Sequence, residues 1–105
     1  PKIAYASTTT EMIEYEATRV GAVPELALLI ARSESNFDTL AKNPSSTASG
    51  IFQLTAGFRK KFCPGIDPFD PVENTKCAVG VMANDGYHHW SESAQGWSGI
   101  RYPKQ

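Results

Sequence analysis

The chain lacks the features that mark membrane proteins and nucleic-acid-binding proteins. No apolar run in its 105 residues approaches the roughly eighteen residues that a membrane-spanning helix needs. Its acidic and basic residues nearly balance, and the formal net charge is −1, so electrostatics give no indication of a nucleic-acid partner. We therefore expect neither a membrane span nor nucleic-acid binding.

Cysteine is scarce as well, and Cys63 and Cys77 flank a proline-rich loop. A disulfide between them would close a loop of about fifteen residues and contribute on the order of 3 kcal/mol in the chain-entropy model. Two reduced, buried cysteines are the alternative. We favour the disulfide, which indicates an oxidising compartment. The start at Pro1 rather than Met is expected of a mature or trimmed form.

Few residues are available to join the two cysteines in a zinc site. Only His88 and His89 could join the two cysteines, and adjacent histidines are expected to point in different directions. We therefore predict no metal site and no cofactor. The length and the 41% hydrophobic content predict one globular domain covering residues 1–105, and we expect a monomer.

Helix signals occur in four places along the chain. Hydroxyl side chains at residues 7–10 precede an amphipathic stretch that Gly21 ends, and Pro24 then opens a largely apolar stretch. A short basic helix is expected over residues 55–62, and Asp70 followed by proline starts another. The predicted fold class is mainly α: a small helical domain with a central buried helix and a polar loop or short β-hairpin beside a cleft.

Glu34 ends the apolar stretch and is the candidate catalytic acid. Residues 26–31 carry no charge, and Leu26, Ile30 and Glu34 lie on one helix face. Partial desolvation and the negative end of the helix dipole both raise the pKa of such a carboxyl, as a general acid requires. The alternative is a solvated surface Glu that pairs with a cation such as Arg32.

Two motifs around this acid resemble those of a known family. SESNFD contains Glu34, and TASGIFQLT places Gln53 nineteen residues later. Together they resemble the lysozyme-like fold, and most closely the bacterial soluble lytic transglycosylases, with E-S ending a buried helix, a polar loop and then G-[LI]-[MF]-Q. SSTASGIFQ is also similar to the matching loop of c-type lysozymes. DPFDPVENTKCAVGV is similar to the family's D-P-x-x-N-x-x-x-G helix. The resemblance covers residues 24–82.

The resemblance implies a secreted, periplasmic or cell-wall-associated enzyme that degrades peptidoglycan strands. Glu34 would act as general acid and then as base at the bond between N-acetylmuramic acid and N-acetylglucosamine, with Gln53 facing it across the cleft. Two departures stand out. Ala48 occupies the position where c-type lysozymes carry an Asp, and the family's Y-N-x-G segment is missing, with Tyr87 and Tyr102 as candidates to replace its tyrosine.

Further side chains are candidates for binding the glycan. The hydroxyls of Ser46 and Thr47 suit sugar hydroxyls or acetamido groups, although turn chemistry explains them equally well. Gly50 leaves room for a glycan to approach the backbone. Tyr87 offers an aromatic face for a sugar ring, with burial in the core as the competing explanation.

One acid without an obvious partner favours a lytic transglycosylase, which leaves 1,6-anhydro-muramic acid ends. Two alternatives stay open. A muramidase (lysozyme) would hydrolyse the same bond with a bound water, and Asp38, Asp67 or Asp85 would then be the acids to fold close to Glu34. A peptidoglycan- or chitin-binding module would have the fold without activity.

Overall fold

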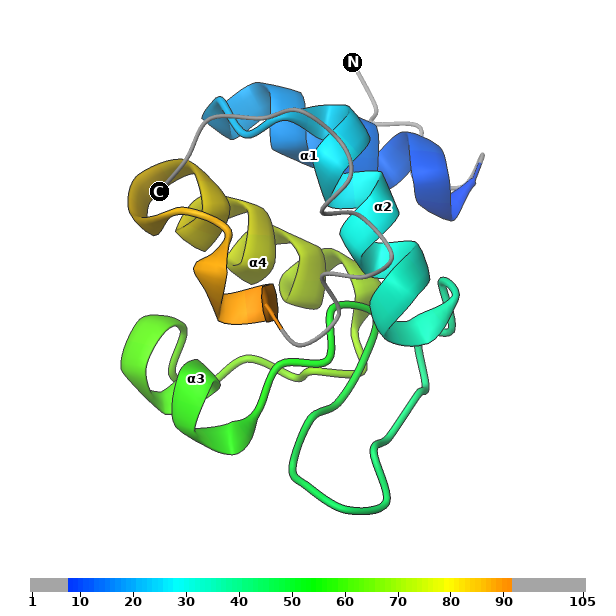
Figure 1. Cartoon of the computed structure of the whole chain (residues 1–105), viewed down its shortest axis with the longest axis vertical. Coiled ribbons are helices and arrows are strands. Elements are labelled where there is room, and N and C mark those ends of the chain that lie inside the picture. Colours follow the sequence, from blue (N-terminus) through cyan, green and yellow to red (C-terminus); the bar gives the residue numbers. More distant parts are fainter. Residues whose placement is uncertain (1–7, 92–105) are drawn as a thin grey trace.

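The computed structural model describes residues 8–91, which fold into four α-helices joined by loops (Figure 1). The helices are α1 (Thr9–Val20), α2 (Pro24–Ser35), α3 (Ala56–Phe62) and α4 (Pro71–Asp85). A 3₁₀ turn follows at residues 88–91. The predicted mainly helical class is confirmed. Tyr102 lies outside the described residues.

The helix boundaries follow the local signals in the sequence. The Thr8 side chain accepts a hydrogen bond from the Glu11 N–H at the start of α1, and Gly21 ends that helix in the left-handed conformation, with φ of 87°. At the start of α4, the Asp70 carboxylate accepts from the backbone N–H groups of Val72 and Glu73. These side chains satisfy backbone groups that have no partner inside the helix, so the predicted helix starts and stops are confirmed.

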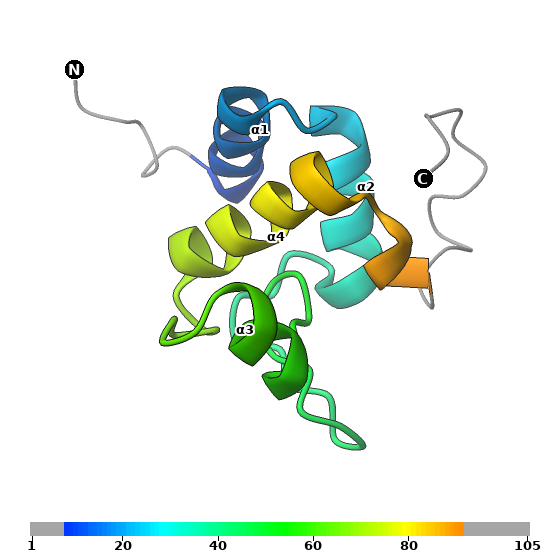
Figure 2. The same ribbon diagram turned by 90° about the vertical axis from the view of Figure 1, so that its left-hand side faces the viewer.

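Helix α4 lies between the α1–α2 pair and α3, as two perpendicular views show (Figures 1 and 2). Helix α1 packs against both α2 and α4, and α3 packs on α4. Helices α1, α2 and α4 and the segment before α3 share one core, against which the partly buried Phe58 and Phe62 of α3 pack. Its fully buried apolar members include Ile13, Ala17, Leu26, Ala27, Ile30, Ala31, Ile51, Phe52, Ala78 and Val79. The helix that carries Glu34 and the segment that leads to Gln53 are therefore anchored in the same core.

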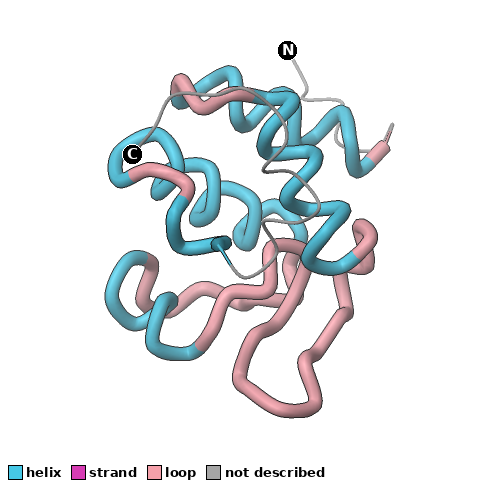
Figure 3. The backbone as a smooth tube through the Cα atoms, in the orientation of Figure 1, coloured by secondary structure: helices cyan, strands magenta, loops and turns pink. Residues whose placement is uncertain are grey.

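The segment between α2 and α3 is a long loop that extends away from the helices (Figure 3). Isolated antiparallel bridges join Ser49 to Lys42 and to Leu54, and no strand forms within residues 8–91. The Lys42 ammonium group donates to the carbonyls of Asn43 and Ser46 across the loop. Of the two predicted forms, the segment is thus a polar loop held by single bridges.

The predicted disulfide is present between Cys63, at the end of α3, and Cys77 on α4, with 6.0 Å between their Cα atoms. It joins the least buried helix to the helix in the middle of the fold. Within residues 8–91, no helix is long and apolar enough to span a bilayer.

Candidate active site

A cavity of about 410 Å³ opens between the end of α2, the long loop and the 3₁₀ turn. We call it the Glu34 cavity. Its lining residues come from separate segments of the chain and are Glu34, Asn43, Ser46, Ala48, Gln53, Thr55, His89, Trp90 and Ser91. Glu34 is half-buried there, and Gln53 lines the same space. The structure thus brings together the two residues that the sequence motifs singled out.

Ser35 fixes the end of the helix that carries Glu34. Its Oγ lies 3.3 Å from the Ala31 carbonyl oxygen and 2.7 Å from the Ile51 carbonyl oxygen, to which the hydroxyl donates. Ile51 belongs to the Gly-Ile-Phe-Gln segment, so this bond ties the last turn of α2 to the opposite wall. The Ser that follows the Glu in the motif therefore has a physical role in holding the two walls at a set distance.

The backbone on both sides of the cavity adopts uncommon conformations. Asn36 and Phe37, directly after α2, have φ of 53° and 65°, and Gln53 has φ of 51°. Non-glycine residues rarely adopt positive φ, and they keep it only where surrounding contacts enforce it. At Gln53 the side-chain amide supplies such contacts, because Nε2 donates to the carbonyls of Gly50 (2.8 Å) and Ala41 (3.1 Å).

Glu34 is the only carboxylate among the described residues that line the cavity. Ala48 lies in the same wall and is 7% exposed, so the position where c-type lysozymes carry an acid presents a methyl group here. Asp85 is not a lining residue, but it contacts one: Nε2 of His89 donates to Oδ2 of Asp85 at 2.7 Å. This hydrogen bond holds the pKa of the Asp85 carboxyl below its ordinary value.

A family model, Transglycosylase SLT domain, matches residues 11–94, which is most of the chain. The chain belongs to the SLT domain family. Searches among curated proteins and among solved structures gave no match. Membership indicates a peptidoglycan-degrading activity of the lytic transglycosylase type. The matched range contains every described residue that lines the Glu34 cavity, including those of the 3₁₀ turn.

In this SLT domain Gly50 is required by the chain's own packing. It is buried with φ of 81°, and a Cβ atom there would overlap the Pro68 carbonyl oxygen and the Asn74 side chain. The expectation that Gly50 leaves space for a glycan is therefore corrected. The space next to its backbone is already occupied by the segment that precedes α4.

The two predicted loop hydroxyls have different surroundings. Ser46 lines the Glu34 cavity, and its Oγ accepts a hydrogen bond from the Ala48 N–H. Thr47 is not among the lining residues, and its Oγ1 accepts from the Ala56 N–H at 2.8 Å. Ala56 is the first residue of α3, so Thr47 satisfies one of the free N–H groups at the start of that helix.

Tyr87 is buried, with 5% of its surface exposed, and its hydroxyl accepts from the Val23 N–H at 3.0 Å. It therefore supports the start of α2 and is not one of the lining residues of the Glu34 cavity. The predicted place of Tyr87 in the cleft is corrected. The aromatic side chains that line the cavity are His89 and Trp90, and the Trp90 indole N–H donates to the Phe52 carbonyl at 3.1 Å.

Asn74 holds the cavity wall from behind, and sequence reasoning gave it no role. Its fully buried amide accepts from the Phe52 N–H (3.0 Å) and donates to the carbonyls of Ser49 (3.1 Å) and Pro68 (2.9 Å). Helix α4 thereby positions, through Asn74, the segment that leads to Gln53. The available signal was an amide side chain on the otherwise apolar face of the predicted helix.

Proposed function

We propose that this SLT domain is a lytic transglycosylase that cleaves the N-acetylmuramic acid–β-1,4–N-acetylglucosamine bond with Glu34 as its single acid and base. The observation that carries the proposal is the composition of the Glu34 cavity. Of its described lining residues only Glu34 is a carboxylate, and Ala48 offers neither a nucleophile nor a group to hold a water. A retaining mechanism with two carboxylates lacks its second acid in this wall.

Glu34 first donates its proton to the glycosidic oxygen, and the bond from that oxygen to C1 of the muramic acid breaks. The substrate's own acetamido group stabilises the positive charge that develops at C1. The Glu34 carboxylate then takes the proton of the muramic acid 6-hydroxyl, whose oxygen bonds to C1. The product has a 1,6-anhydro ring, no water is consumed, and Glu34 regains its proton.

Polar groups along the same cavity are suited to holding the sugar. Because Nε2 of Gln53 is engaged by two loop carbonyls, Oε1 is the atom it can offer to a sugar hydroxyl or an acetamido N–H. Asn43 accepts from the Ser45 N–H through Oδ1, so its Nδ2 is the group it can turn to the glycan. The Ser46 hydroxyl completes this polar side. The disulfide supports action outside the cytoplasm.

One observation favours hydrolysis as a second candidate. His89 lines the Glu34 cavity and is hydrogen-bonded to Asp85, and such a pair is able to hold and polarise a water. If that water reaches C1 before the 6-hydroxyl does, the enzyme is a muramidase and the product is a reducing sugar.

Mass spectrometry of digested peptidoglycan separates these outcomes. Purified protein is incubated with isolated sacculi, and the released fragments are analysed without a reducing step. We expect 1,6-anhydro-muramic acid ends, with none formed by the Glu34→Gln variant. Reducing ends would identify a muramidase. Retained binding to sacculi without any release would identify a binding module and overturn the proposed activity.

A further inference from the structure

Three side chains at the end of α4 and in the 3₁₀ turn place their ligand atoms together. These atoms of Asp85, His88 and His89 all lie within 4.8 Å of one another. The His88 and His89 rings lie 4.1 Å apart, with 35° between their planes. The expectation that adjacent histidines diverge, on which the exclusion of a metal site depended, is therefore corrected. The two cysteines that were considered as further metal ligands are bonded to each other in the disulfide.

We propose that Asp85, His88 and His89 bind a divalent transition-metal ion of the zinc class at the rim of the Glu34 cavity. Imidazole nitrogen and carboxylate oxygen are the donors that zinc takes in proteins, and sites with three protein ligands keep a fourth position open. The proposal does not depend on the proposed glycan chemistry, since it concerns only the affinity of these side chains for the ion.

The spacing of the side chains is close to what zinc requires. Zinc bonds of about 2.0–2.1 Å in a tetrahedron separate neighbouring ligand atoms by about 3.3 Å. Oδ2 of Asp85 lies 2.7 Å from Nε2 of His89 and 3.9 Å from Nε2 of His88, so the two observed separations bracket this value. Small rotations of the two half-exposed side chains, Asp85 and His88, suffice to bring all three to the ion.

His89 is the preorganised member of the group. It is 21% exposed, and its ring makes edge contacts with Phe58 and Phe62 at centroid distances of 5.4 and 5.2 Å. A ligand already held by packing loses little conformational freedom when the ion binds. Lys61 acts in the opposite direction, because its positive charge is felt at Asp85.

Titration calorimetry with zinc chloride tests the proposal on untagged, chelator-stripped protein in a buffer that does not bind metals. We expect one zinc per chain. Asp85→Asn and His88→Ala should each weaken binding by at least about tenfold, since loss of a ligand costs no less than loss of a group that only orients one. Asp38→Asn is the matched control at an exposed acid elsewhere and should leave the affinity unchanged. Magnesium and calcium should not bind, because they prefer oxygen ligands.

Nuclear magnetic resonance of the two imidazoles provides a second readout on the unaltered chain. Zinc should shift the ring resonances of both His88 and His89, and Lys61→Gln should raise the affinity. Asp85 and His88 are 51% and 56% exposed, so their variants should fold, which circular dichroism checks. Unshifted imidazole resonances in wild-type protein would overturn the proposal, as would zinc affinity that is equal in wild type and both ligand variants.

Discussion

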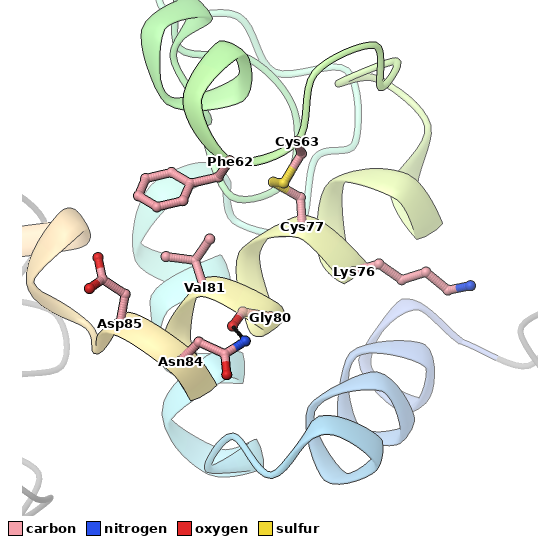
Figure 4. Close-up of a pocket in the computed structure, with 8 residues that line it drawn as sticks. All are labelled: Phe62, Cys63, Lys76, Cys77, Gly80, Val81, Asn84 and Asp85. Atoms are coloured by element: carbon pink, nitrogen blue, oxygen red, sulfur yellow. Dashed lines mark hydrogen bonds between the residues drawn. A yellow bond between two sulfur atoms is a disulfide. The ribbon is translucent and has the colours of Figure 1, made fainter.

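The Glu34 cavity and a second cavity in the fold are similar in size and differ in how they are built. The second, of about 330 Å³, lies beside the disulfide between α3 and α4, and we call it the disulfide groove (Figure 4). Its lining residues are Phe62, Cys63, Lys76, Cys77, Gly80, Val81, Asn84 and Asp85, most of them successive positions on one face of α4. The lining of the Glu34 cavity comes from separate segments and is rich in hydrogen-bonding side chains.

The contrast shows that the origin of the lining residues along the chain identifies a functional site better than the cavity volume does. The disulfide groove follows from two neighbouring helices joined by a covalent bond, with Gly80 leaving open space along it. The walls of the Glu34 cavity are held by bonds that join distant parts of the chain, such as those of Ser35 and Asn74. Substitutions at the first should therefore alter stability, and substitutions of exposed groups at the second should alter turnover.

The largest effect is expected from Glu34→Gln. It removes the proton donor and changes little else, so turnover of peptidoglycan should fall by about 10²–10⁴-fold, the usual contribution of a general acid and base. The unfolding midpoint and binding to sacculi should stay close to those of wild type. Fragment release and a pelleting assay measure the two properties.

Glu25→Gln is the control for that comparison, because Glu25 is exposed in the first turn of the same helix. It should keep wild-type turnover. If Glu34→Gln and Glu25→Gln were equally active, Glu34 would be a solvated helix-end residue. The Glu34 cavity would then have no catalytic acid to distinguish it from the disulfide groove.

The next effect tests Gly50, which lies in the segment that leads to Gln53 and acts through folding. Gly50→Ala adds a Cβ atom at positive φ against the Pro68 backbone, so we expect the free energy of unfolding to fall by about 3–5 kcal/mol. Urea unfolding measures it. Gly57→Ala is the matched control: it lies in α3 with open space around its Cβ position and should stabilise the protein by up to about 1 kcal/mol. An equal change in the free energy of unfolding for both variants would show that the Pro68 backbone moves to make room for the new Cβ atom.

What the sequence predicted well were features decided by neighbours along the chain. The caps at Thr8 and Asp70 depend on residues two or three positions away, and both formed as expected. The family motif singled out Glu34 and Gln53, which line one cavity, and their roles there stay predictions. Such features carry their own signal, so a single sequence is enough to find them.

What the sequence left open were side chains whose partners lie far away. The hydroxyl of Tyr87 meets Val23, and the amide of Asn74 meets Ser49. A Tyr or Asn that completes a distant backbone bond has the same sequence signature as one that faces a sugar. Gly50 was singled out correctly as special, but its neighbour is a proline eighteen positions on.

The third prediction concerns the disulfide groove. Replacing Cys63 and Cys77 by serine together should lower the free energy of unfolding by about 3 kcal/mol, because the open chain gains entropy when unfolded. Below the lowered melting temperature, turnover should stay within about twofold of wild type, since neither sulfur lines the Glu34 cavity.

Added reductant gives an internal control, as it should destabilise wild type and leave the double variant unchanged. Loss of turnover in a folded double variant would contradict the separation of the two cavities, and would mean that α3 transmits its position to the loop that carries Gln53.

The smallest effect distinguishes a tether from a sugar ligand at Thr47. Thr47→Val keeps the shape of the side chain but removes the oxygen that accepts from the Ala56 N–H. Water can reach this exposed helix start, so the loss of stability should be only about 1 kcal/mol, whereas Thr47→Ser should restore most of it. The KM for soluble glycan fragments should be unchanged in both. A raised KM with unaltered stability would reverse the assignment and identify Thr47 as a glycan-binding residue, because only a bound sugar would then need its oxygen.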